Sequence, residues 1–256
     1  MGTEIHFSVK KKLKNPVLFI GLPGIGLVGK IAIDYMVKQL NPKKIADIYS
    51  TSFPPSIYTN DGIINLISDE IYLYETKKRD FLFVIGPVQP SLSINFASTE
   101  QHYEFSAKLV ELAIQLGVKD VYTLAGINVG DKRMESKPQI VVAATHKDML
   151  KSFKEAEINK TGGLISGAAG LILGMAKQRG LKGACIMGET NARLIYGDHG
   201  AAKKIIETIV GLYGFKLDMK GIKKESKNIE DAFKQLSKQM PHKEEEEHHE
   251  DLTYVR

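Results

Sequence analysis

Short apolar runs that end at a glycine recur along the first 215 residues, and they constrain the fold most. Residues 17–20 (VLFI), 81–85 (FLFVI) and 121–125 (VYTLA) each precede a glycine, which is typical of buried strands that enter a turn. Between the last two runs, apolar side chains at positions 105, 109, 112 and 116 predict a helix over residues 96–116. Strands that alternate with helices in this way predict right-handed crossovers and a mostly parallel sheet between two layers of helices.

One pair of predicted strands departs from this alternation. Residues 63–67 and 71–74 are separated by Ser68-Asp69-Glu70, and the spacing predicts that they pair as an antiparallel hairpin. We therefore expect an α/β body over residues 1–215 whose sheet is mixed.

Composition and charge exclude several classes of protein. Hydrophobic residues make up 43% of the 256 and charged residues 25%, as in an average globular protein. The single cysteine, Cys185, allows no intrachain disulfide and no thiolate metal site. The N-terminus lacks the apolar core of a signal peptide, and the longest weakly polar run, residues 162–176, is shorter than the ~20 residues that span a bilayer. We expect a cytoplasmic protein without a membrane partner, and the net charge of +5 is too small to predict a nucleic-acid partner.

The composition changes after residue 215. Residues 216–243 carry 8 basic and 4 acidic side chains, and apolar side chains within them share one face of an amphipathic helix: Ile229, Phe233, Leu236 and Met240. This helical extension either folds against the body or forms an oligomer stalk. Residues 244–256 carry 6 acidic side chains and 1 basic one, which predicts a flexible acidic tail because a dense block of like charge repels itself.

A glycine-rich loop follows the first buried strand and opens a helix: Gly24, Gly26, Gly29 and Lys30. This order is typical of loops that hold a nucleotide phosphate at a helix N-terminus. The position of the magnesium-binding hydroxyl in a P-loop is occupied by Ile31, and the acid that would bind a ribose is Asp47, inside its predicted strand. The alternative is that the glycines permit a tight turn and close packing of helix on sheet, and we favour this alternative.

Polar side chains also follow the strand that contains Cys185. Glu189, Asn191 and Arg193, together with Asp198 and His199, could form a ligand pocket, because ligands bind at the carboxyl edge of open α/β sheets. The alternative is that they cap helices and bond to loop backbone. Since the sequence contains no constellation typical of a catalytic or metal site, we predict no catalytic residues, no metal and no cofactor.

The last five residues form an apolar and aromatic tip after the acidic run: Leu252, Thr253, Tyr254, Val255 and Arg256. An apolar tip on a charged tether is the build of a docking peptide, whereas the alternative is a frayed terminus.

Four segments resemble, in the same order, the proteasome assembly chaperone family in its archaeal branch. They are residues 18–29 (LFIGLPGIGLVG), 163–173 (GLISGAAGLIL), 188–190 (GET) and 201–204 (AAKK). The resemblance covers residues 15–215, nearly the whole body. It implies an α/β fold similar to that of nucleoside phosphorylases and a homo-oligomer, as a tetramer or pentamer. It also implies ATP-independent binding to proteasome α subunits or to the 20S core particle.

Members of that family that act on the proteasome carry a C-terminal motif of a hydrophobic residue, tyrosine and any residue. Here Tyr254 is third from the end rather than penultimate, so the motif is displaced by one position. The resemblance implies that Leu252 and Tyr254 are the anchors of a partner-binding tail. We predict an assembly chaperone homologue or activator-like factor that performs no catalysis. The rival hypothesis is a nucleotide- or nucleoside-using enzyme with its site in the loop of residues 24–30.

Overall fold

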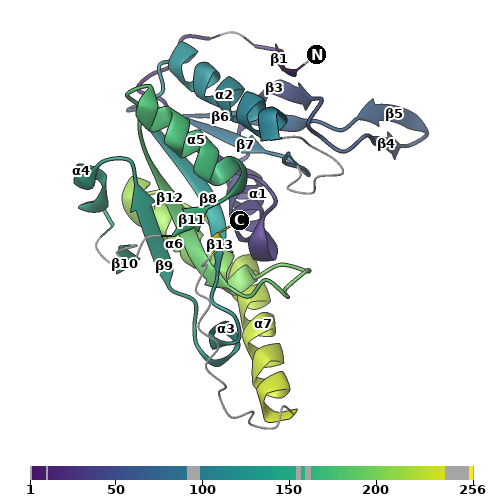
Figure 1. The fold of residues 1–256 in the computed structure, drawn as a ribbon, viewed down its shortest axis with the longest axis vertical. Coiled ribbons are helices and arrows are strands. Elements are labelled where there is room, and N and C mark those ends of the chain that lie inside the picture. Colours follow the sequence, from purple (N-terminus) through teal and green to yellow (C-terminus); the bar gives the residue numbers. More distant parts are fainter. Residues whose placement is uncertain are drawn as a thin grey trace.

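The computed structural model of the chain describes residues 2–9, 11–90, 99–153, 157–158, 163–239 and 254–255. One mixed sheet lies between two layers of helices, with a long C-terminal helix packed below it (Figure 1). This architecture confirms the predicted α/β class.

Four parallel strands form the centre of the sheet: β7 (Asp80–Ile85), β2 (Val17–Gly21), β8 (Asp120–Asn128) and β12 (Lys182–Thr190), in that spatial order. Every residue of β2 is buried, as expected of a strand that is covered on both faces.

The flanks of the sheet are antiparallel. Beyond β7 lie β6 (Asp69–Glu75), β3 (Lys43–Ser50) and β1 (Thr3–Phe7), and beyond β12 lies β9 (Ile140–Ala144). A further short strand, β10 (Glu157–Ile158), pairs parallel with β9. The sheet is therefore parallel at its centre and at the short β9–β10 pair, and it is more antiparallel than the sequence predicts.

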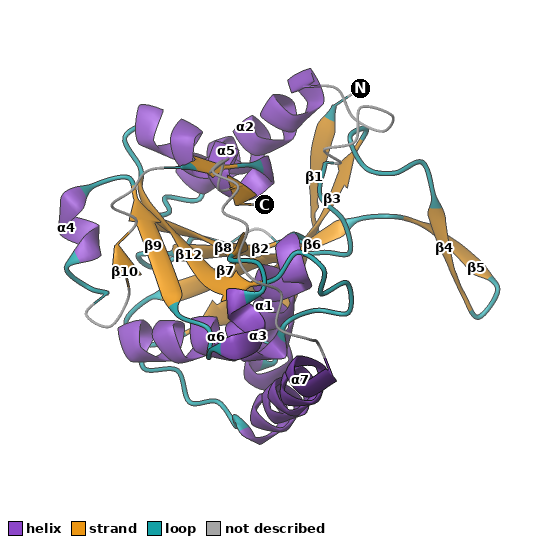
Figure 2. Cartoon of the chain, turned by 60° about the horizontal axis from the view of Figure 1, so that its bottom comes forward, coloured by secondary structure: helices purple, strands orange, loops and turns teal. Residues whose placement is uncertain are grey.

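Two pairs of helices cover the two faces of the sheet (Figure 2). One face is covered by α2 (Thr99–Gln115) and α5 (Gly167–Gln178), and the other by α1 (Val28–Leu40) and α6 (His199–Tyr213). The second layer also holds an aromatic cluster, in which the ring centroids of Phe81 and Phe215 lie 4.6 Å apart. Among the described residues, no helix is both long enough and apolar enough to cross a membrane.

The long helix α7 (Lys220–Gln239) packs on α6 and on the short helix α3 (Lys132–Glu135). It buries Ile222 and Phe233 against the body. The predicted helix at residues 229–240 therefore begins about two turns earlier than expected. Within one chain the helix folds against its own body. A role as an oligomer stalk stays a prediction.

The predicted hairpin between residues 63–67 and 71–74 is wrong. Residues 63–66 form β5 (Ile63–Leu66), which pairs with β4 (Ile57–Asn60) in a separate two-stranded sheet, whereas β6 pairs with β3 and β7. The physical reason is the turn at Asp61-Gly62, whose φ angles of 48° and 77° fit a tight two-residue hairpin. This hairpin projects away from the body in both views (Figures 1 and 2).

The close approach of α1 to the sheet depends on Gly29. A Cβ at this position would lie 2.0 Å from the carbonyl oxygen of Leu124 in β8, and backbone cannot move aside as the end of a flexible side chain can. The glycine therefore sets the distance between helix and strand at the centre of the fold.

We predict that Gly29→Ala destabilises the protein by about 3 kcal/mol or more, because the added methyl group forces α1 away from β8. The matched control is Gly174→Ala in α5, where no heavy atom lies within 4 Å of the added Cβ. This second change is expected to stabilise by about 0.5–1 kcal/mol, since alanine is the better helix former. Urea unfolding of both variants measures the contrast, and equal effects would contradict it.

Candidate functional site

The glycine-rich loop lies at the carboxyl end of β2, in the crevice where the chain order reverses. From β2 the chain continues to β3 on one side of the sheet, and from β8 it continues to β9 on the other. In open α/β sheets this crevice is the usual ligand site. The loop forms a single 3-10 turn, η1 (Ile25–Leu27), before α1, and Gly26 and Leu27 both have positive φ, at 57° and 48°.

Neighbouring groups account for the glycines of this loop. A Cβ on Gly26 would lie 2.5 Å from Thr190 Oγ1, and Gly29 packs against the backbone of β8. Across the crevice, a Cβ on Gly126 would likewise lie 2.3 Å from the carbonyl oxygen of Ile25. The beginning of α1 is therefore wedged between β8 and β12, and the favoured packing explanation of the motif is sufficient for these positions.

The cavity beside this loop is small. It is lined by Pro23, Gly24 and Gly29 from the loop and by Leu124 and Ser166 opposite, and its volume is about 20 Å³. That volume holds about one water molecule, since a bound water needs roughly 10–15 Å³. A nucleotide would have to displace protein atoms to reach the crevice.

Lys30, the last residue of the motif, faces a different space. Its ammonium group pairs with Asp34 at 2.5 Å, and it lines a polar cleft of about 750 Å³ that also contains Asp47. The structure thus brings the two charged residues of the nucleotide hypothesis to one cleft, outside the glycine turn. In that cleft Lys44 Nζ bonds to Asp47 and Glu70 at 2.6 and 2.7 Å. Burial lowers the pKa of Lys44, but these two hydrogen bonds outweigh it and the net pKa is raised.

The polar residues predicted to form a pocket are bonded to the protein itself. Glu189 is 4% exposed, and its carboxylate accepts from the Gln139 N–H at 3.0 Å. Asn191 donates to the Gly130 carbonyl oxygen at 2.9 Å, while its own oxygen accepts from the Arg193 N–H at 2.9 Å. The Arg193 guanidinium is exposed and lies 3.5 Å from Asp131. These contacts agree with the alternative hypothesis, in which the side chains bond to loop backbone. A ligand role for them stays a prediction.

A buried ion pair that no sequence pattern indicates lies behind this loop. Arg133 is fully buried and donates from Nε and Nη2 to the two carboxylate oxygens of Asp198, at 2.7 and 2.9 Å. Its Nη2 also donates to Glu230 of α7 at 2.7 Å. Burial lowers the pKa of Arg133, and the hydrogen bonds to Asp198 and Glu230 outweigh this effect, so the net pKa is raised. The sequence around Arg133 reads as a polar loop, and no periodic pattern there indicates that this arginine is buried and ion-paired.

Cys185 lies in β12 and is fully buried. Burial raises the pKa of its thiol to about 12, so the thiolate is scarce at neutral pH. In this environment the Cys185 thiol is a poor nucleophile.

The C-terminal tip is paired with the body. Tyr254–Val255 form β13, which runs parallel to β11 (Leu164–Ile165) and places Val255 opposite Ile127 of β8. Leu252, Thr253, Arg256 and the acidic run lie outside the described residues. The partner-binding role of the tip stays a prediction.

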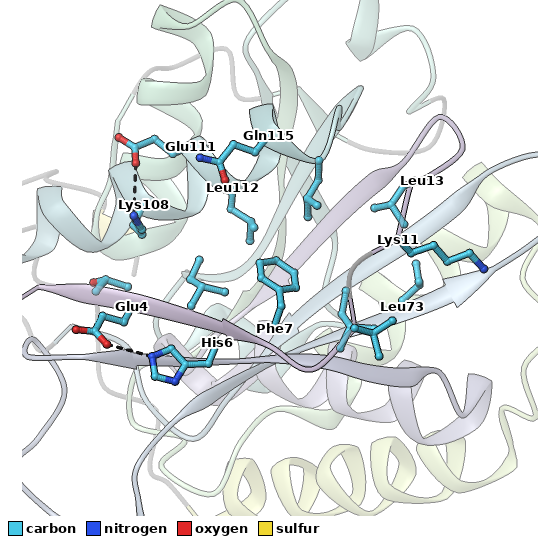
Figure 3. A pocket seen from close by; sticks show the side chains of 15 residues that line it. Glu4, His6, Phe7, Lys11, Leu13, Leu73, Lys108, Glu111, Leu112 and Gln115 are labelled. Atoms are coloured by element: carbon cyan, nitrogen blue, oxygen red, sulfur yellow. Dashed lines mark hydrogen bonds and ion pairs between the residues drawn. The ribbon is translucent and has the colours of Figure 1, made fainter.

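An apolar hollow lies elsewhere, between β1 and α2 (Figure 3). Its volume is about 630 Å³, within the range of ligand and peptide sites. Its floor consists of half-buried or buried apolar side chains: Ile5, Phe7, Val9, Leu13, Ile45, Leu73, Leu112 and Leu116. We call this hollow the β1–α2 groove. The sequence gives little signal for this groove, because residues 3–7 are a short segment with only two apolar side chains and do not by themselves predict the strand β1.

Known proteins of the same fold cover nearly the whole chain. The crystal structure of Pyrococcus furiosus PbaB, an archaeal proteasome activator, is similar with a TM-score of 0.81 and 27% identity, over 92% of this chain and 99% of that one. Pyrococcus furiosus PbaA, an archaeal homologue of proteasome-assembly chaperone, shares the fold with a TM-score of 0.73 and 21% identity, over 93% of each chain.

One sequence relative shares a higher identity with this chain than these two structures do. The uncharacterized protein MJ1210 of Methanocaldococcus jannaschii is 34% identical over 229 residues, which is 88% of this chain and 84% of the relative. The family model that matches is that of the PAC2 family, over residues 18–237. The predicted resemblance is thereby confirmed, and the chain belongs to the PAC2 family.

Proposed function

We propose that this cytoplasmic protein binds proteasome α subunits or the 20S core particle, as an assembly chaperone homologue or an ATP-independent activator-like factor. The observation that carries the proposal is the similarity to PbaB, an archaeal proteasome activator, at 27% identity over nearly the full length of both chains. No catalytic step is part of the proposal. Binding depends partly on the C-terminal tails.

The position of α7 supports a role for the tail. Phe233 is buried on α7, and the Arg133 guanidinium lies 5.0 Å from its ring. Together with the bond from Arg133 to Glu230, this contact fixes the base from which the tail departs. From there, residues 240–253 could span at most about 50 Å when fully extended. A tip on such a tether can reach a partner beyond the outline of the body.

Docking of the tip on a partner requires that it leave its place on the body. The backbone pairing of β13 involves two residues on β11 and one on β8. Each backbone hydrogen bond contributes only about 0.5–1.5 kcal/mol net, so the self-paired position is weak enough to be exchanged for a partner pocket. Leu252 and Tyr254 are the proposed anchors in that pocket.

Several tails on one particle would bind more tightly than one. In a homo-oligomer, such as the tetramer or pentamer implied by the family resemblance, each further tail binds at a raised effective concentration. Avidity can then exceed single-tail affinity by about 10²–10⁴ without new contacts. A modest anchor such as a displaced tyrosine motif is therefore sufficient.

We predict that Tyr254→Ala weakens binding to α subunits or the core particle by at least about tenfold, because an aromatic anchor is lost from every tail at once. The matched control is Tyr196→Ala, which removes a tyrosine that is 89% exposed on the body. Mass measurement of the complexes at a series of concentrations gives both affinities. Unchanged binding by Tyr254→Ala and by a chain that lacks residues 252–256 would exclude docking through the tip.

We predict that Glu230→Ala loosens α7 by about 1–3 kcal/mol, because it removes a charged partner of a buried arginine. Hydrogen exchange in residues 220–233 is expected to accelerate. Glu225→Ala, on an exposed position of the same helix, is the control that should leave exchange unchanged. Equal exchange rates in the two variants would mean that the ion pair does not hold the helix.

For the rival enzyme hypothesis we expect a negative result. Calorimetric titration with ATP, NAD or a nucleoside should give no binding at micromolar concentration, because the crevice at the glycine loop measures about 20 Å³. Micromolar binding that Gly26→Val abolishes, in a variant whose circular dichroism is unchanged, would restore the nucleotide site.

A further inference from the structure

The hairpin formed by β4 and β5, residues 57–66, exposes an unusual amount of apolar surface. We call it the β-arm. All eight of its strand residues are exposed, and Ile63, Ile64 and Leu66 are 65%, 68% and 66% exposed. In the part of the chain that the structure describes, half of the large hydrophobic side chains that are exposed lie on this arm. Its strands pair with each other and not with the main sheet.

Both faces of the β-arm are apolar. The register pairs Ile57 with Leu66 and Thr59 with Ile64, so these four side chains share one face. Tyr58 and Ile63 lie on the opposite face, beside two asparagines. A two-stranded hairpin is marginal in water by itself, and a segment of low net charge and high β-propensity is prone to aggregate when it stays uncovered. We therefore expect another protein surface to cover the arm.

The β1–α2 groove is the complementary feature. Its floor is apolar, its volume is about 630 Å³, and the helix α2 forms only one of its walls (Figure 3). The strand β3 links the two features, since Ile45 lines the groove and the chain reaches the arm after the end of the strand at Ser50. The groove and the root of the arm thus lie on the same flank of the sheet.

We propose that the β-arm of one copy of this chain inserts its apolar side chains into the β1–α2 groove of a second copy. The arm projects away from its own body, so it does not fill its own groove (Figures 1 and 2). One contact between copies covers both exposed surfaces. Face-to-face contact of such apolar patches is the usual basis of a permanent interface.

The charges of the two surfaces favour this occupant. The arm carries a single formal charge, Asp61 at its tip, whereas the groove carries two lysines and two glutamates: Lys11, Lys108, Glu4 and Glu111 (Figure 3). Lys11 is paired with Glu75 at 2.5 Å, whereas Lys108 lies 3.9 Å from Glu111, at the limit of an ion pair. Glu4 bonds to His6 at 3.0 Å. The charged groups of the groove thus have partners within their own chain, and an arm whose strand residues carry no charge matches the apolar floor between them. A highly charged helix would gain nothing from the apolar floor.

This contact rests on the proposed homo-oligomer and adds the surfaces that build it. It does not involve the tail, so assembly and partner binding can be measured separately. A monomeric wild-type chain that binds proteasome subunits would overturn the arm contact alone. An intact arm contact in a chain that binds no proteasome subunit would overturn the proposed function alone.

Cross-linking tests the contact directly. Protein with Ile64→Cys in the arm is mixed with protein that carries Leu116→Cys in the groove, and a short bismaleimide is added. The native Cys185 thiol is fully buried and does not compete. The expected product has twice the protomer mass of 28.4 kDa. A mixture of Leu116→Cys with Ile195→Cys, at a position 72% exposed elsewhere on the body, should give none.

A charge-insertion variant provides the second measurement. Ile64→Lys combined with Leu66→Lys should raise the dissociation constant of the assembly at least about tenfold, because two ammonium groups would enter an apolar groove. Ile195→Lys should leave it unchanged. Both variants should keep the wild-type circular dichroism, since the arm lies outside the core. An assembly that survives the double variant, or a missing arm–groove product, would overturn the proposal.

Discussion

The buried pair of Arg133 and Asp198 holds together the carboxyl edge of the sheet. Asp198 accepts both guanidinium bonds, caps α6 through the Ala201 N–H at 3.0 Å, and accepts from Thr190 Oγ1 at 3.0 Å. Its own N–H donates to the Gly26 carbonyl oxygen at 2.8 Å. A buried charge is tolerated only when its hydrogen bonds are satisfied, and here they are supplied by α3, by β12 and by the first turn of α6. The pair thereby links the loop after β2, the end of β12, α3 and α6.

The same edge holds ligands in many α/β proteins, and here protein atoms fill it. Gly29 and Gly126 let the start of α1 sink between the strands, while the oxygens of Asp198 are bonded to Arg133 and to the helix cap. Beside the glycine loop, a volume of only about 20 Å³ is left for a small molecule. The surfaces proposed for recognition, the β-arm and the β1–α2 groove, lie at the periphery instead.

Local patterns predicted the centre of the fold well and its periphery poorly. Fully apolar strands that end in glycine, and the apolar helix stripe around Leu109, can be recognised in the sequence because burial requires apolar residues at these positions. The predicted hairpin of residues 63–67 and 71–74 is wrong because the Asp61-Gly62 turn joins residues 63–66 to the strand that precedes them, residues 57–60. The candidate site was harder, because Arg133 and the groove arise from contacts between residues far apart in the chain. The glycine loop was located from sequence, but its packing role depended on knowing what faces each Cβ.

The place of the tip follows from the unequal lengths of two neighbouring strands. β2 pairs with β8 only as far as Thr123, and β8 continues to Asn128, so its carboxyl half lacks a neighbour on that side. β13 pairs there through Val255. A strand edge with unpaired groups favours any short extended segment, yet two residues gain little free energy from it. In the proposed docking the tip exchanges this edge for a partner pocket, and that exchange would couple partner binding to exposure of the β8 edge.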